Sequence, residues 1–164
     1  MELIQGRVLN DMPVSGRHGE VQAMIATAFR NFLSPRWLAR IAVETGFILR
    51  HEPDVVLAPD VSATSIERLP DGRLPEDTFV QGAPNLAVEV VSPGDAEARV
   101  WAKVGEYLDA RVDRIWLVRL RSRTVVVVRS DGEIQQLGAG ETLTSEHAGF
   151  AEAGFGLPVG DIFR

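Results

Sequence analysis

The chain contains no cysteine, and Lys103 is the single lysine among its seventeen basic residues. The absence of cysteine excludes disulfide bonds and thiolate zinc sites, and it fits the cytoplasmic location that we expect. No apolar run approaches the roughly 20 residues that a membrane-spanning helix needs, so we expect no membrane partner. The first ten residues have neither the basic segment nor the apolar segment of a signal peptide, so we expect none.

The length of 164 residues predicts one domain, residues 1–164, with room for a hydrophobic core. The net charge of −6 argues against broad nucleic-acid binding through a basic surface. The charge is unevenly placed, however, because residues 95–129 contain eight basic and five acidic residues. This segment either presents a locally positive face or carries scattered, solvated charges.

The pattern of apolar residues predicts the elements of a mixed fold. Residues 17–33 have apolar positions at helical spacing, and the nearly continuous apolar run over 85–92 is typical of a central strand buried on both faces. The other predicted elements are an opening strand and turn over 1–10, strands over 37–49, 54–64 and 113–120, a loop over 65–83, a helix over 92–110, a hairpin over 123–143 and an apolar C-terminal turn. Their order predicts an α/β fold in which helices flank a central mixed β-sheet.

Three predicted strands each carry one acid in an apolar setting, namely Glu44, Asp60 and Glu89. A buried carboxylate costs several kcal/mol unless it is paired, protonated or bound to a metal ion. If the strands are neighbours, the acids converge. A bound hard cation such as Mg²⁺ would then offset the repulsion between their negative charges. Alternatively, Glu89 and Glu44 point outward or pair with arginine, and Asp60 belongs to a simple turn.

Lys103 stands on the predicted helix that follows the Glu89 strand. On a helical wheel it lies at the flank of an apolar stripe, so its stem can follow the core while its ammonium group reaches past the helix. A helix that packs back over the preceding strand brings this group toward Glu89. The alternative is a flank residue whose place arginine could also fill. The stripe consists of Val100, Val104, Tyr107 and Leu108.

Several segments together resemble the Uma-two family, which has the PD-(D/E)XK restriction-endonuclease-like fold. The resemblance runs over nearly all of the chain, and its most specific parts are "APDV" and "LAVEVVSP" followed by a helical lysine. The other parts are "ELIQGRV", "GRHGEVQ", "ETGFIL", "KVGEYLDARVDRIWLV" and "GLPVGDIF". The resemblance therefore implies a restriction-endonuclease-like core.

By the same resemblance, Asp60 and Glu89 match the two metal-binding acids, and the carbonyl of Val90 would be a further metal ligand. The wider superfamily has a lysine two residues after the second acid, where this chain has Val91. The family places this lysine on the following helix, and Lys103 matches it.

The resemblance gives two further positions secondary roles near the site, Glu44 and His18. Arg99, one helical turn before Lys103, is a candidate contact for phosphate, although a solvated surface role is the alternative. A histidine at the start of a helix can also be only a cap or a surface residue.

The resemblance implies an endonuclease dependent on Mg²⁺ or Mn²⁺ that hydrolyses phosphodiester bonds of nucleic acid, with DNA as the expected substrate and a homodimer as the expected form. Two other functions stay open. The chain could be a catalytically inactive nuclease-fold protein that serves as a binding or assembly module, because a fold does not fix a function. It could also be a hydrolase of small ligands that uses the same metal cluster.

Overall fold

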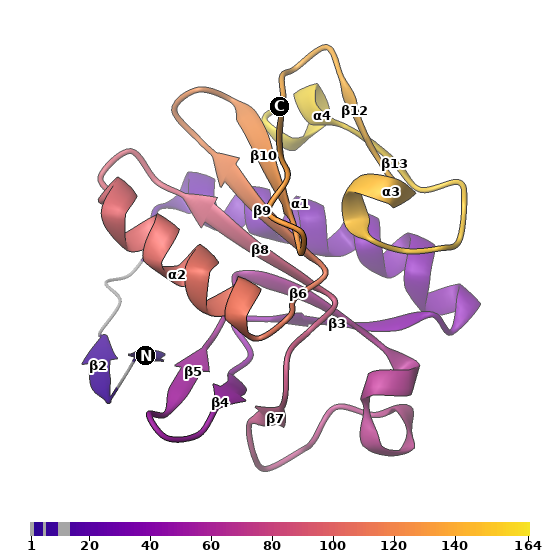
Figure 1. The fold of residues 1–164 in the computed structure, drawn as a ribbon. Coiled ribbons are helices and arrows are strands. Elements are labelled where there is room, and N and C mark those ends of the chain that lie inside the picture. Colours follow the sequence, from indigo (N-terminus) through magenta and orange to yellow (C-terminus); the bar gives the residue numbers. More distant parts are fainter. Residues whose placement is uncertain (1, 5, 10–13) are drawn as a thin grey trace.

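The computed structural model of the chain describes residues 2–4, 6–9 and 14–164 (Figure 1). Of the strand and turn predicted over residues 1–10, Met1, Gln5 and Asn10 lie outside the described residues. No helix within the described ranges is both long enough and apolar enough to cross a membrane.

A mixed β-sheet forms the centre of the fold. In the part of the chain that the structure describes, this sheet has six strands; β8 and β9 run parallel, and the other neighbours run antiparallel. In spatial order they are β11 (Ile134–Leu137), β10 (Thr124–Arg129), β9 (Arg114–Arg119), β8 (Leu86–Val91), β6 (Val61–Ser65) and β3 (Ala39–Val43). The apolar run that predicted a central strand is β8, which lies inside the sheet.

Helices α1 (Gly16–Leu33) and α2 (Glu97–Asp109) cover opposite faces of this sheet (Figure 1). Alternate residues of β8 pack into different cores, because successive side chains of a strand point to opposite faces. Val88 packs in the core that contains α1, whereas Ala87 and Val91 pack in the core that contains α2. Glu89 has the same parity as these last two and therefore faces α2. The predicted α/β fold with flanking helices is confirmed.

Two of the predicted strands are each divided between the central sheet and a second, smaller sheet. The strand predicted over 37–49 is divided between β3 and β4, and the one predicted over 54–64 is divided between β5 and β6, so each pair spans both sheets. Glu44 turns the chain after β3 with a left-handed backbone (φ 49°), and Pro59 lacks the N–H that a continuous ladder needs. The smaller sheet contains, in spatial order, β2 (Arg7–Leu9), β1 (Glu2–Ile4), β5 (Val55–Leu57), β4 (Phe47–Arg50) and β7 (Val80–Gln81).

Two other predicted segments contain more structure than the sequence pattern indicates. The predicted loop over 65–83 holds two short 3₁₀ turns, at Ile66–Arg68 and Pro70–Gly72, and ends in β7. After the hairpin, the C-terminal segment forms β12 (Thr142–Thr144), α3 (Ser145–Ala148), β13 (Gly156–Pro158) and α4 (Val159–Ile162). This segment closes the α1 side of the core, where the ring of Phe155 stacks on Phe29 with centroids 4.9 Å apart.

Candidate active site

The three acids that the sequence singles out stand at one end of three neighbouring strands. Residues of β3, β6 and β8 pair in one row across the sheet, and Glu44, Asp60 and Glu89 are each one residue beyond that row. The paired residues of the row are Val43, Val61 and Val88. The three acid-bearing strands are therefore neighbours, which is the condition under which the acids were expected to converge.

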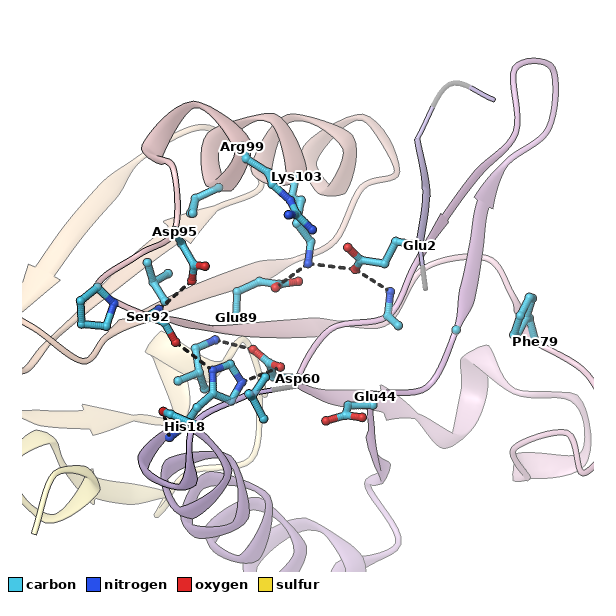
Figure 2. Close-up of a pocket in the computed structure, with 18 residues that line it drawn as sticks. Glu2, His18, Glu44, Asp60, Phe79, Glu89, Ser92, Asp95, Arg99 and Lys103 are labelled. Carbon is cyan, nitrogen blue, oxygen red and sulfur yellow. Dashed lines mark hydrogen bonds and ion pairs between the residues drawn. The ribbon is translucent and has the colours of Figure 1, made fainter. Parts of the chain in front are cut away.

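All three acids line one pocket with a volume of about 1220 Å³ (Figure 2). The pocket lies where β8 ends, between the first turn of α1, helix α2 and the smaller sheet. Its lining also contains each of the other predicted site residues, namely His18, Val90, Arg99 and Lys103. The structure thus brings together residues that are spread over 86 positions of the sequence, from His18 to Lys103.

Glu89 forms an ion pair with Lys103, whose Nζ donates to Oε2 at 2.6 Å. The hydroxyl group of Tyr107 donates to the other carboxylate oxygen, Oε1, also at 2.6 Å. Lys103 and Tyr107 are four residues apart in α2 and so project from the same helical face. Burial and the nearby charge of Glu89 raise the pKa of Tyr107 well above its usual value, so the hydroxyl stays protonated and remains a donor.

Burial is the main reason why the pKa of Glu89 rises to about 7. Lys103 opposes this shift, whereas the negative charges of Asp60 and Glu2 add to it. The side chain of Glu89 is only 13% exposed, so water does little to solvate its charge. This carboxylate is therefore poised to gain a cation or a proton near neutral pH.

Lys103 has a second carboxylate partner, Glu2 from β1. Oε1 of Glu2 lies 2.9 Å from Nζ of Lys103 and also accepts a hydrogen bond from the backbone N–H of Ala58 at 3.1 Å. Glu2 is 3% exposed, and its other oxygen, Oε2, is buried without a hydrogen-bond partner among the described residues. Burial alone would lower the pKa of Lys103, but Glu89 and Glu2 outweigh burial and raise it, so the ammonium group keeps its charge.

Asp60 is held by donors from two directions. Its Oδ1 lies 2.9 Å from Nε2 of His18, and its Oδ2 accepts the backbone N–H of Val90 at 2.6 Å. His18 is 5% exposed in the first turn of α1, which Ser15 caps, and its Nδ1 lies 3.3 Å from Oγ of Ser92. Burial alone would lower the pKa of His18, but the hydrogen bond to Asp60 and the negative charge of Asp60 outweigh burial and raise it.

Glu44 directly follows β3, the outermost strand of the central sheet on this side, and is joined to Asp60 through a residue of α1. The side-chain amide of Gln22 donates to Oε1 of Glu44 at 3.1 Å and to the carbonyl oxygen of Asp60 at 2.9 Å. Gln22 is one helical turn after His18, so both side chains face the end of β6. This bridge links the side chain of Glu44 to the backbone of Asp60.

Sequence reasoning assigned no role to Glu2, Gln22 or Tyr107. Tyr107 was placed in the apolar stripe of its helix, which is correct for its ring, but this placement overlooked its hydroxyl group. Glu2 precedes the apolar pair Leu3–Ile4, and an acid in a short apolar strand was the available signal. Gln22 could have been found from its helical spacing to His18.

The oxygen donors of the pocket suit a hard divalent cation. Among the described residues, no group of three or more histidine, aspartate or glutamate side chains is arranged to hold a metal ion. Mg²⁺, however, commonly uses one or two protein carboxylates and completes its shell with water and substrate phosphate. Asp60, just before β6, and Glu89, on the neighbouring strand β8, supply two such carboxylates. Burial raises the pKa of Glu89 even though Lys103 lies beside it, and a bound cation would favour the ionised form of this carboxylate.

Comparisons with known proteins agree with this architecture. A crystal structure described as "a putative nuclease belonging to DUF820" from Anabaena variabilis ATCC 29413 matches with a TM-score of 0.80 and 21% sequence identity, over 99% of this chain and 88% of that chain. This likeness shows a shared fold. The comparison with curated proteins finds no match. The family model "Uma2: Putative restriction endonuclease" matches residues 1–159, so the resemblance seen in the sequence is confirmed and the chain belongs to the Uma2 family.

Proposed function

We propose that the chain is a metal-dependent endonuclease that hydrolyses phosphodiester bonds of nucleic acid, with DNA as its substrate. The observation that carries this proposal is the joint placement of Asp60, Glu89 and Lys103 in one pocket. The ammonium group is 2.6 Å from the carboxylate of Glu89 on β8, and Asp60 immediately precedes the neighbouring strand β6. Family membership supports the same reaction class.

In this proposal, Asp60, Glu89 and the carbonyl of Val90 would hold Mg²⁺ or Mn²⁺. When bound, such an ion lowers the pKa of a coordinated water and stabilises negative charge on phosphate oxygens. Hydrogen bonds hold both carboxylates in place without a metal ion. His18 and the N–H of Val90 hold Asp60, and the hydroxyl of Tyr107 holds Glu89. Donors of this kind orient metal ligands, and their loss commonly costs about 10- to 100-fold in affinity or activity.

Lys103 supplies a fixed positive charge beside the metal-binding acids. Its charge would neutralise the negative charge that develops on the phosphate, or orient the attacking water. Because Glu2 and Glu89 hold the ammonium group from two sides, little reorganisation is needed during the reaction. We assign Glu2 the role of a positioning residue that acts through Lys103.

Isothermal titration calorimetry with Mg²⁺ and with Mn²⁺ tests the metal site. We expect the wild-type chain to bind the ion, and Asp60→Asn and Glu89→Gln each to weaken binding at least about 10-fold. Glu20→Gln, which neutralises an acid on the exposed side of α1, is the matched control and should bind like wild type. Absence of divalent-metal binding by the wild-type chain would contradict the proposal. Metal binding without cleavage of any nucleic acid would instead favour a catalytically inactive binding module.

A further inference from the structure

Phe79 places an exposed aromatic ring in the same pocket as the acids. It lies just before β7, and its exposure is 53%, which is high for a phenylalanine. In Figure 2 its ring stands apart from the charged cluster, at the end of the pocket away from Lys103 and Arg99. Single exposed apolar residues are common on protein surfaces, so the support for this ring and its position within the pocket decide whether it has a role.

The ring of Phe79 rests on the bare backbone of Gly46. A Cβ atom at Gly46 would lie 2.6 Å from the ring, so any larger residue there would displace it. The N–H of Val80 donates to the carbonyl of Gly46 at 2.9 Å and fixes the two segments together. The ring therefore has the backbone of Gly46 as a support on one side, and Phe79 is part of the pocket lining.

The two ends of the pocket differ in chemistry in the way that the two ends of a nucleotide differ. The end formed by α2 carries Lys103 and Arg99 beside the acids that would hold the metal ion, whereas the end at β7 carries the apolar ring of Phe79. A nucleotide joins an anionic phosphate to a flat aromatic base, and bases stack on aromatic side chains irrespective of their identity. The volume of about 1220 Å³ lies above the usual range of pockets for a single small ligand.

We propose that Phe79, supported by Gly46, is a stacking platform for a nucleobase that flanks the phosphate bound at the acids. This inference rests on the proposed nuclease function and adds a substrate property to it. A base can stack on this ring only if it is unpaired or turned out of the duplex. The site therefore favours single-stranded nucleic acid, or duplex in which a base near the cut is extruded.

Fluorescence anisotropy of a labelled single-stranded deoxyoligonucleotide tests the platform, with Ca²⁺ replacing Mg²⁺ to slow cleavage. We expect Phe79→Ala and Phe79→Leu to weaken binding about 5- to 150-fold, the range typical of one base–aromatic stack, whereas Phe79→Tyr and Phe79→Trp stay close to wild type. Gly46→Ala should also weaken binding, because it displaces the ring without removing it. Trp37→Ala removes another exposed aromatic side chain, 69% exposed and outside the pocket lining, and should have no effect.

A second readout locates the stacked base. The fluorescent base 2-aminopurine is placed at each position of the oligonucleotide in turn, and stacking at one position should quench it with wild type but not with Phe79→Ala. Equal affinity of wild type and Phe79→Ala, or full affinity of Phe79→Leu, would overturn the platform while leaving the nuclease proposal intact. If the wild-type chain cleaves plasmid DNA but binds no single-stranded oligonucleotide, the platform alone fails, whereas the nuclease proposal fails only if no DNA is cleaved. Melting temperatures confirm that each variant is folded.

Discussion

The ammonium group of Lys103 lies 2.6 Å from Oε2 of Glu89, although the two residues belong to a helix and a strand that are separated by a turn. The same ammonium group lies 2.9 Å from Oε1 of Glu2 on β1. The ammonium group of Lys103 thus links helix α2 to the central sheet through Glu89 and to the smaller sheet through Glu2. A compact ammonium group on a flexible stem fits between these two carboxylates, in a chain whose other strong cations are all arginine.

Replacement of Lys103 by arginine tests the need for this compact charge. Lys103→Arg keeps the positive charge but puts a larger, planar group into a space where the lysine side chain is only 12% exposed. We expect it to lower kcat markedly, and Lys103→Ala to lower kcat about 10²- to 10³-fold, the loss typical of removing one electrostatic donor. Steady-state cleavage of a labelled DNA measures both. Full activity of Lys103→Arg would show that this position needs a positive charge but not a compact ammonium group.

Neutralisation of Glu2 tests its role in holding Lys103. Glu2→Gln keeps an oxygen that can accept the N–H of Ala58 but removes the charge that faces the ammonium group. We expect a loss of about 10- to 100-fold in kcat, as for other residues that orient a metal site, with little change in KM. Kinetics of Glu2→Gln beside Glu20→Gln provide the measurement. A purely structural Glu2 would instead lower the melting temperature and leave kcat of the folded protein unchanged.

The pKa of Glu89 predicts how the stability of the metal-free protein depends on pH. Burial raises this pKa to about 7 from the usual 4.5, so the folded state holds the proton more tightly than the unfolded state. The stabilisation is therefore present below about pH 4.5 and is lost as the pH rises through about 7. By linkage, the loss between pH 5 and pH 8 is about 2–3 kcal/mol, and Glu89→Gln does not show it.

Urea unfolding of both proteins in EDTA at these two pH values measures this difference. His18, whose pKa is also raised, contributes in the same direction in both proteins and cancels from the comparison. A wild-type chain whose unfolding free energy changes with pH in the same way as that of Glu89→Gln would show that Glu89 is ionised throughout this range.

The sequence predicted the three acids Glu44, Asp60 and Glu89 as site residues because each interrupts an apolar segment. It could not show that the strands over 37–49 and 54–64 divide between two sheets. Their apolar patterns continue across the bends at Glu44 and Pro59, and only tertiary packing separates the segments. The helix predicted from residue 92 begins at Glu97, because Asp95 uses its carboxylate to cap the N–H of Ser92 in a turn before the helix.

The residues that sequence reasoning missed share one physical property. Glu2 and Tyr107 act through single polar atoms on side chains whose other surroundings are those of ordinary core positions. Their partners come from distant parts of the chain, Lys103 for Glu2 and Glu89 for Tyr107. Local patterns report whether a position is buried, whereas the partner of a buried polar atom is set by the fold.

Cleavage of supercoiled plasmid DNA by wild type and Glu89→Gln, each with Mg²⁺ and with EDTA, tests whether Glu89 holds a catalytic metal ion. The substituted glutamine side chain has nearly the same shape as that of glutamate but lacks the charge that holds a cation. We expect that only wild type with Mg²⁺ converts supercoiled DNA to nicked or linear forms. Cleavage by wild type in EDTA, or equal cleavage by Glu89→Gln, would contradict it.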